Sequence, residues 1–181
     1  MVNMEWLQTM ERWIPELQDT IPAALEAVTR GRDDIVSVGL FTDSDAGTLQ
    51  AAALSQAHWD SIRTEESEHT VLDAWDPDEW DLFPGDERNV LDSVMAKVRA
   101  LASEVPESQW ESFLLLAFNV IVEAMKGLYQ DGFFDTAYPN ANVAFWVTDT
   151  KVHRENLVEW MSLLNPPERV APYVQYLRTT Y

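Results

Sequence analysis

Apolar residues recur at steps of three and four between residues 4 and 28, which is the spacing of one helix face. They are Trp6, Met10, Trp13, Ile14, Leu17, Ile21, Leu25 and Val28. Pro15 and Pro22 each lack a backbone donor, so the pattern predicts a kinked helix or two shorter ones. Gly31 follows at a position where a helix commonly ends.

The next two apolar runs have the pattern of strands. Ile35–Thr42 is short, apolar and β-branched, which is typical of an inner strand. Residues 43–47, Asp-Ser-Asp-Ala-Gly, are turn residues, so residues 48–54 are expected to pair back as a second strand. Ser55 is expected to cap a helix that runs to about residue 66.

Two helices are predicted in the middle of the chain. Apolar periodicity places the first from about Leu91 to the residues before Pro106. Pro106 then opens the longest helix, which runs to about Gln130 and ends at Gly132. Its apolar residues face nearly all sides, so we expect this helix to be buried.

A third strand is predicted at residues 142–148, followed by a helix to Leu164 that Asp149 or Thr150 caps. A final short helix is predicted over residues 170–177. Few strands and much helix predict one α+β domain over residues 1–181, with a small, mainly antiparallel sheet covered by helices.

Five tryptophans fall at positions that these elements turn toward the core, and we interpret them as packing residues. They are Trp6, Trp13, Trp110, Trp146 and Trp160.

The composition is that of a folded protein, with 46% hydrophobic and 24% charged residues, but its net charge of −19 is unusual. Residues 60–92 hold 12 acids and 2 bases, a net charge of −10. Such a field favours cationic partners and repels nucleic acid and anionic membranes. The concentration favours a local site over a uniformly acidic surface, although a solvated face stays open as an explanation.

Other bulk features exclude some classes of protein. The chain has no cysteine, which excludes disulfides, cysteine nucleophiles and thiolate metal sites. Its first residues show no basic stretch before an apolar run, and the longest apolar run, residues 113–118, is about a third of a membrane span. We therefore expect a cytoplasmic protein.

The most informative stretch is residues 71–88, Val-Leu-Asp-Ala-Trp-Asp-Pro-Asp-Glu-Trp-Asp-Leu-Phe-Pro-Gly-Asp-Glu-Arg, which we name the acidic segment. Aromatic anchors among dense negative charge are typical of a surface that binds a basic protein. The residues that we expect to contact such a partner are Asp73, Trp75, Asp76, Asp78, Glu79, Trp80, Asp81, Asp86 and Glu87.

Part of the acidic segment has a structural explanation. Asp76, Pro77 and Glu79 have the spacing of a helix start, with a cap, a proline in the first turn and an acid three residues after the cap. Trp75 and Trp80 flank this turn. They can either pack the turn onto the body of the protein or contact a partner, and the sequence favours neither role over the other. We expect one ring to face inward and the other outward.

Two segments carry a recognisable pattern: the strand and turn at residues 38–49 and the Trp-x-Pro-x-Glu-Trp element at residues 75–80. Both resemble the pattern of a bacterial family, domain-of-unknown-function 4303. Later segments match in order and spacing, namely residues 128–134, 145–149 and 163–167. The resemblance covers about residues 15–170. It implies an association with bacterial gene neighbourhoods of toxins and immunity proteins, which favours an inhibitor and assigns no residue.

The sequence shows no catalytic motif, and we expect neither an enzyme nor a cofactor or metal site. Asp43, Asp45 and Gly47 resemble the opening of a calcium loop, but the twelfth position is a leucine, so we interpret them as a hairpin turn. His58, His69 and His153 have no metal-ligand spacing.

The prediction is therefore an acidic, immunity-type inhibitor that binds a cationic toxin domain, for example a nuclease, and neither nucleic acid nor membrane. The alternative is a metal-dependent or acid–base enzyme that uses buried carboxylates such as Asp43, Asp73 or Asp149.

Overall fold

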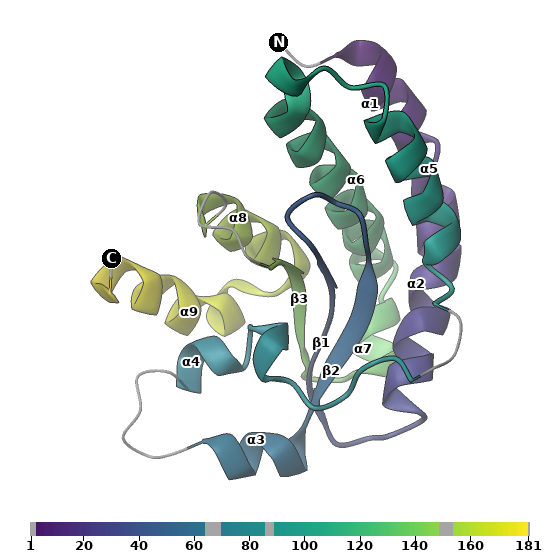
Figure 1. The fold of residues 1–181 in the computed structure, drawn as a ribbon. Coiled ribbons are helices and arrows are strands. Elements are labelled where there is room, and N and C mark those ends of the chain that lie inside the picture. The colour runs from purple at the N-terminus through teal and green to yellow at the C-terminus, as the bar shows by residue number, and fades with distance from the viewer. Residues whose placement is uncertain (1–2, 64–69, 86–88, 149–153, 181) are drawn as a thin grey trace.

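Three strands form an open sheet in the order β2-β1-β3 (Figure 1). In this computed structural model, which describes residues 3–63, 70–85, 89–148 and 154–180, β1 (Ile35–Thr42) is the central strand. It pairs antiparallel with β2 (Gln50–Ser55) and parallel with β3 (Asn142–Val147). The predicted α+β class, with a small sheet covered by helices, is confirmed.

The turn between β1 and β2 is held by one carboxylate. Asp43 accepts hydrogen bonds from the N–H groups of Asp45 (3.1 Å) and Gly47 (2.7 Å) and from the hydroxyl of Thr48 (2.8 Å). This confirms the predicted hairpin turn and explains why an aspartate stands at its start.

The N-terminal pattern forms two helices, as predicted: α1 (Met4–Glu11) and α2 (Ile14–Thr29). Pro15 lies in the first turn of α2, where a missing N–H leaves no helical bond unmade, whereas Pro22 is accommodated inside the helix. The chain leaves α2 through two residues in the left-handed conformation, Arg30 (φ 50°) and Gly31 (φ 72°).

One face of the sheet is covered by α2, α5 (Asp92–Ala102) and α6 (Trp110–Gln130). A short 3-10 turn, η2 (Glu107–Gln109), precedes α6, and α7 (Phe133–Ala137) follows it after the left-handed Gly132. Eleven side chains of α6 are buried, so the prediction of a buried helix is confirmed. Residues 107–130 have the length and apolarity of a membrane span, but most of that stretch lies inside the core.

The other face is covered by α3 (Gln56–Ile62), α4 (Thr70–Asp73), the 3-10 turn η1 (Pro77–Glu79) and α9 (Pro167–Thr180). Ser55 caps α3 as predicted, by accepting from the N–H of His58 at 3.2 Å. Two helices differ in length from the prediction: α3 ends at Ile62, and α9 begins at Pro167 because proline suits a first helical turn.

Helix α8 (Arg154–Leu164) lies along β3 and contributes side chains to both cores. After it, the Asn165 side chain accepts from the N–H of Val143 (2.8 Å) and donates to its carbonyl (2.7 Å), and it also donates to the carbonyl of Met161 (2.9 Å). The side-chain amide of Asn165 thus makes the two hydrogen bonds to the backbone of Val143 that a neighbouring strand would otherwise make at the edge of β3. The expected caps Asp149 and Thr150 lie outside the described residues.

The tryptophans expected in the core lie there. Trp6 and Trp160 are buried, and the other three are partly buried against the main core, namely Trp13, Trp110 and Trp146.

Candidate functional site

The described part of the acidic segment, residues 71–85, lies over a row of small residues in the sheet. Gly39 pairs with Ala52 on one side and with Ala144 on the other, so three small residues stand side by side across the three strands. A side chain at position 39 would collide with the carbonyl oxygen of Ala144. The sheet therefore has a shallow face here, on which large side chains can pack.

Trp75 and Trp80 pack on that face, in the same core cluster as Ala52 and Ala144. They are only 3% and 4% exposed, so the expectation that one ring faces outward is wrong. The ring of Trp75 packs against that of Tyr173 in α9, with ring centroids 5.6 Å apart.

The polar group of the Trp80 ring, its indole N–H, has a hydrogen-bond partner within the chain. The indole N–H of Trp80 donates to the backbone carbonyl of Asp73 at 3.1 Å. Both tryptophans therefore fix the acidic segment to the sheet, and neither presents an aromatic surface to a partner.

The turn between the tryptophans is built as predicted. Asp76 caps η1, and its carboxylate accepts from the N–H of Asp78 at 3.0 Å. Pro77 is buried below the turn, while Asp78 and Glu79 are exposed. The turn therefore directs two carboxylates outward from a fixed backbone.

The segment after the turn is tied to the end of β2. The Asp81 carboxylate accepts from the N–H of Ser55 (2.8 Å) and from its hydroxyl (2.7 Å). Leu82 then exchanges two backbone hydrogen bonds with Ala53, at 2.9 and 3.0 Å. Asp81 is exposed as well as bonded, so part of its role is to hold this segment in place.

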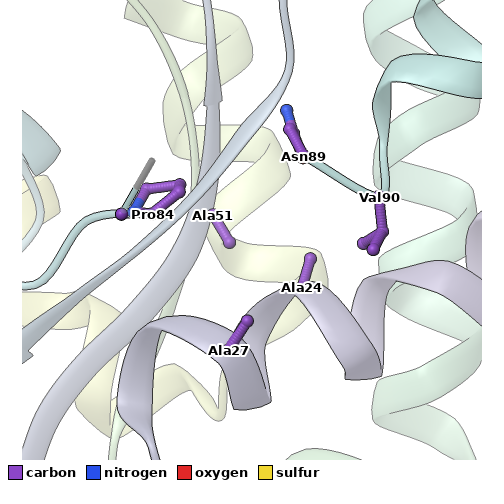
Figure 2. A pocket seen from close by; sticks show the side chains of 7 residues that line it. Ala24, Ala27, Ala51, Pro84, Asn89 and Val90 are labelled. Carbon is purple, nitrogen blue, oxygen red and sulfur yellow. The ribbon is translucent and has the colours of Figure 1, made fainter. Parts of the chain in front are cut away.

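The pairing with β2 ends after this single bridge, because Pro84 has no N–H to continue it. A small pocket of about 80 Å³ opens beside Pro84, between Ala51 of β2 and Ala24 of α2 (Figure 2). Asn89 bounds the pocket, and its side chain donates to the carbonyl of Leu49 at 2.6 Å. The space suits a few water molecules better than an organic ligand.

The pKa of Asp76 is strongly perturbed, from 3.8 to about 6. Burial is the main cause of this rise, and the nearby carboxylates of Asp78, Glu79 and Asp73 add to it. The hydrogen bond from the N–H of Asp78 opposes it. A cation placed beside the turn would therefore favour the ionised form of Asp76.

An exposed aromatic residue that the sequence analysis did not place among the contacts is Phe83. It is 42% exposed and lies edge-on to Phe41 of β1, with ring centroids 6.0 Å apart. The exposure of Phe83 follows from the bridge between Leu82 and Ala53, because the next side chain of an extended segment points to the opposite side. This pairing joins distant residues, so no local sequence pattern indicates it.

The remaining predicted residues have mixed outcomes. Asp73 is partly buried at the end of α4, and Asp86 and Glu87 lie outside the described residues, as do His69 and His153.

In the described part of the chain, no group of three or more histidine or acidic side chains is arranged to hold a metal ion. These residues therefore offer no ligand set for the metal-dependent alternative. Asp43 uses both carboxylate oxygens in its turn, and Asp149 lies outside the described residues. His58 is half-buried, with Nε2 at 3.1 Å from the carbonyl of Glu79.

The fold and this surface define a class: an acidic α+β domain whose η1 turn, with three carboxylates, is anchored on the face of a three-stranded sheet. The chain belongs to the family described as "Domain of unknown function (DUF4303)", whose model matches residues 17–166. The resemblance seen in the sequence is thereby confirmed. No curated protein and no solved structure shows a significant match.

Proposed function

We propose that the protein is an immunity-type inhibitor, which binds a basic toxin domain through the surface formed by η1 and the residues after it. We name this surface the η1 rim; it consists of Asp76, Asp78, Glu79, Asp81 and Phe83. The observation that carries the proposal is that four carboxylates and an exposed aromatic ring lie within residues 76–83, on a backbone anchored to the sheet.

Rigidity supports a binding role. The η1 rim is fixed on one side by the buried ring of Trp80 and on the other by the hydrogen bonds from Ser55 to Asp81. A surface that is ordered before binding loses less conformational entropy when its partner arrives. Anchored carboxylates are therefore better suited to specific recognition than the same charges on a free loop.

The chemistry of the η1 rim suits a cationic partner with a small apolar patch. Arginine or lysine side chains of the partner would pair with Asp78 and Glu79 and would stabilise the ionised form of Asp76. The ring of Phe83 would supply the aromatic anchor that the buried tryptophans do not. The net charge of −19 adds long-range steering toward any basic domain.

The test begins with capture from a lysate of the native host on immobilised wild-type protein, followed by calorimetry with the purified partner. The double variant Asp78→Asn/Glu79→Gln is compared with Glu11→Gln/Glu111→Gln, which changes the net charge equally. These control residues are exposed and lie in α1 and in the first turn of α6, at the opposite end of the molecule from α3 and α4 (Figure 1).

We expect the rim variant to weaken binding by at least about tenfold, since two charge-assisted contacts are lost. The control variant should change the affinity by less than about threefold, because distant surface charges are screened. If no basic protein is captured, or if both variants weaken binding equally, the proposal fails.

One observation favours the enzyme alternative. Carboxyl groups that act in acid–base catalysis often have a raised pKa, and the pKa of Asp76 is raised to about 6. Calorimetric titration with Mg²⁺, Mn²⁺ and Ca²⁺ tests the metal-dependent form of this alternative: saturable binding that Asp76→Asn abolishes would support it, and no binding at millimolar ion would remove it.

A further inference from the structure

A second surface, on the other side of the sheet, has the make-up of a small-ligand site. Helices α2 and α7 border a groove of about 320 Å³, which we name the α2–α7 groove. This volume is within the range of small-molecule sites in proteins. The residues that matter for its chemistry are Pro22, Glu26 and Thr29 from α2 and Phe133, Ala137 and Tyr138 from α7 and its end.

Two residues with hydroxyl groups, Thr29 and Tyr138, line the groove. The Thr29 hydroxyl donates to the carbonyl of Leu25 at 3.0 Å. The hydroxyl oxygens of Thr29 and Tyr138 lie 3.4 Å apart, and either group can donate to the other. A phenol oxygen has two lone pairs, so the oxygen of Tyr138 can accept a further hydrogen bond in either case.

The charge in the groove is negative. Glu26 is exposed on α2, and none of the ion pairs found in the described part of the chain involves it. Burial raises the pKa of Tyr138, the hydrogen bond with Thr29 opposes this rise, and the negative charge of Glu26 adds to it, so the phenol stays protonated at neutral pH. Arg32 at the rim is neutralised by Asp34, with two contacts of 2.7 and 2.8 Å.

The remaining wall is apolar. Phe133 lies edge-on to Tyr138 with ring centroids 6.0 Å apart, and Pro22 and Ala137 complete the lining. An aromatic ring and a carboxylate that line the same groove are a combination that recognises organic cations, because the ring face and the carboxylate both attract positive charge.

We propose that the α2–α7 groove binds a small organic amine, whose ammonium group lies between the carboxylate of Glu26 and the oxygen of Tyr138 and whose apolar body packs on Phe133 and Pro22. The ammonium donates to two oxygens that can accept further hydrogen bonds, and the apolar walls remove the ligand body from water. This site uses different residues from the η1 rim and does not depend on the proposed inhibitor function.

Benzylamine and its neutral counterpart, benzyl alcohol, are suitable probes, with binding followed by calorimetry and by backbone amide shifts in NMR. We expect saturable binding of benzylamine with the largest shifts at Thr29, Phe133 and Tyr138. Benzyl alcohol should bind at least about tenfold more weakly, because it lacks the charge-assisted hydrogen bond.

Matched variants separate a site from general attraction of cations to an acidic protein. Glu26→Gln and Tyr138→Phe should each weaken benzylamine by about fivefold or more, whereas Glu11→Gln, an equal change of charge on α1, should leave it unchanged. The proposal is overturned if benzylamine and benzyl alcohol bind equally, or if the NMR shifts lie elsewhere. It is also overturned if Glu26→Gln and Glu11→Gln have the same effect on benzylamine binding, or if benzylamine at a concentration on the order of 10 mM, which corresponds to a free energy of binding of about −3 kcal/mol, gives no signal.

Discussion

Replacing Asp76 with asparagine should stabilise the protein at neutral pH. Asp76 is held half-buried among other carboxylates, and its pKa is raised from 3.8 to about 6. A raised pKa in the folded state means that protonation favours folding: the contribution is complete below about pH 3.8 and is lost as the pH rises through about 6. The ionised carboxylate therefore costs stability at pH 7.

The size of the effect follows from the shift. A rise of the pKa from 3.8 to about 6 corresponds to about 3 kcal/mol, at about 1.4 kcal/mol for each pH unit. Because the carboxyl is only partly buried, solvent screening reduces this to about 1–2 kcal/mol. Asparagine keeps an oxygen that can accept from the N–H of Asp78, so the cap of η1 is retained.

The assay is urea unfolding of wild type and Asp76→Asn at pH 4 and pH 7.5, followed by tryptophan fluorescence. We expect the variant to be more stable by about 1–2 kcal/mol at pH 7.5 and nearly equal at pH 4. Asp19→Asn, an exposed change of equal charge on α2, should give a smaller difference. A variant that is less stable than wild type at pH 7.5, or a difference that does not vary with pH, would refute the reasoning.

Three further changes test the packing that positions the η1 rim, each by denaturant unfolding. Trp80→Phe should cost about 1–3 kcal/mol, since it loses the bond to the Asp73 carbonyl and part of a buried ring; a neutral result would mean that the indole does not anchor the segment. Gly39→Ala should cost more than about 3 kcal/mol, because its methyl group would collide with the β3 backbone; wild-type stability would contradict the register of β1 and β3. Asn165→Ala should cost about 2–4 kcal/mol, because both backbone groups of Val143 lose their partner; a loss below 1 kcal/mol would show that water replaces the side chain there.

Much of the fold is encoded locally and could be predicted. β1 was predicted residue for residue, because its β-branched run is bounded by turn residues at Asp33 and Asp43. The helix caps at Ser55 and Asp76 and the left-handed Gly132 follow from side chains that bond their own neighbouring backbone or lack a Cβ. Such signals depend on residues a few positions apart.

The parts that could not be predicted depend on contacts between distant residues. The parallel pairing of β3 with β1 joins Gly39 to Ala144, more than a hundred positions apart, and no local pattern specifies it. The burial of both Trp75 and Trp80 follows from that pairing, because the shallow face forms only when Ala52 and Ala144 flank Gly39. Because both rings are buried, the proposal assigns the aromatic contact with a partner to Phe83 instead.

The central claim is that the η1 rim recognises a basic protein. The most direct measurement is the association rate and affinity of the captured partner for wild type, Asp78→Asn/Glu79→Gln and Phe83→Ala, with Glu11→Gln/Glu111→Gln as the control. We predict that the rim pair lowers the association rate and the affinity, that Phe83→Ala mainly speeds dissociation, and that the control pair binds like wild type. Equal behaviour of the rim pair and the control pair would show that only net charge matters and would contradict the account.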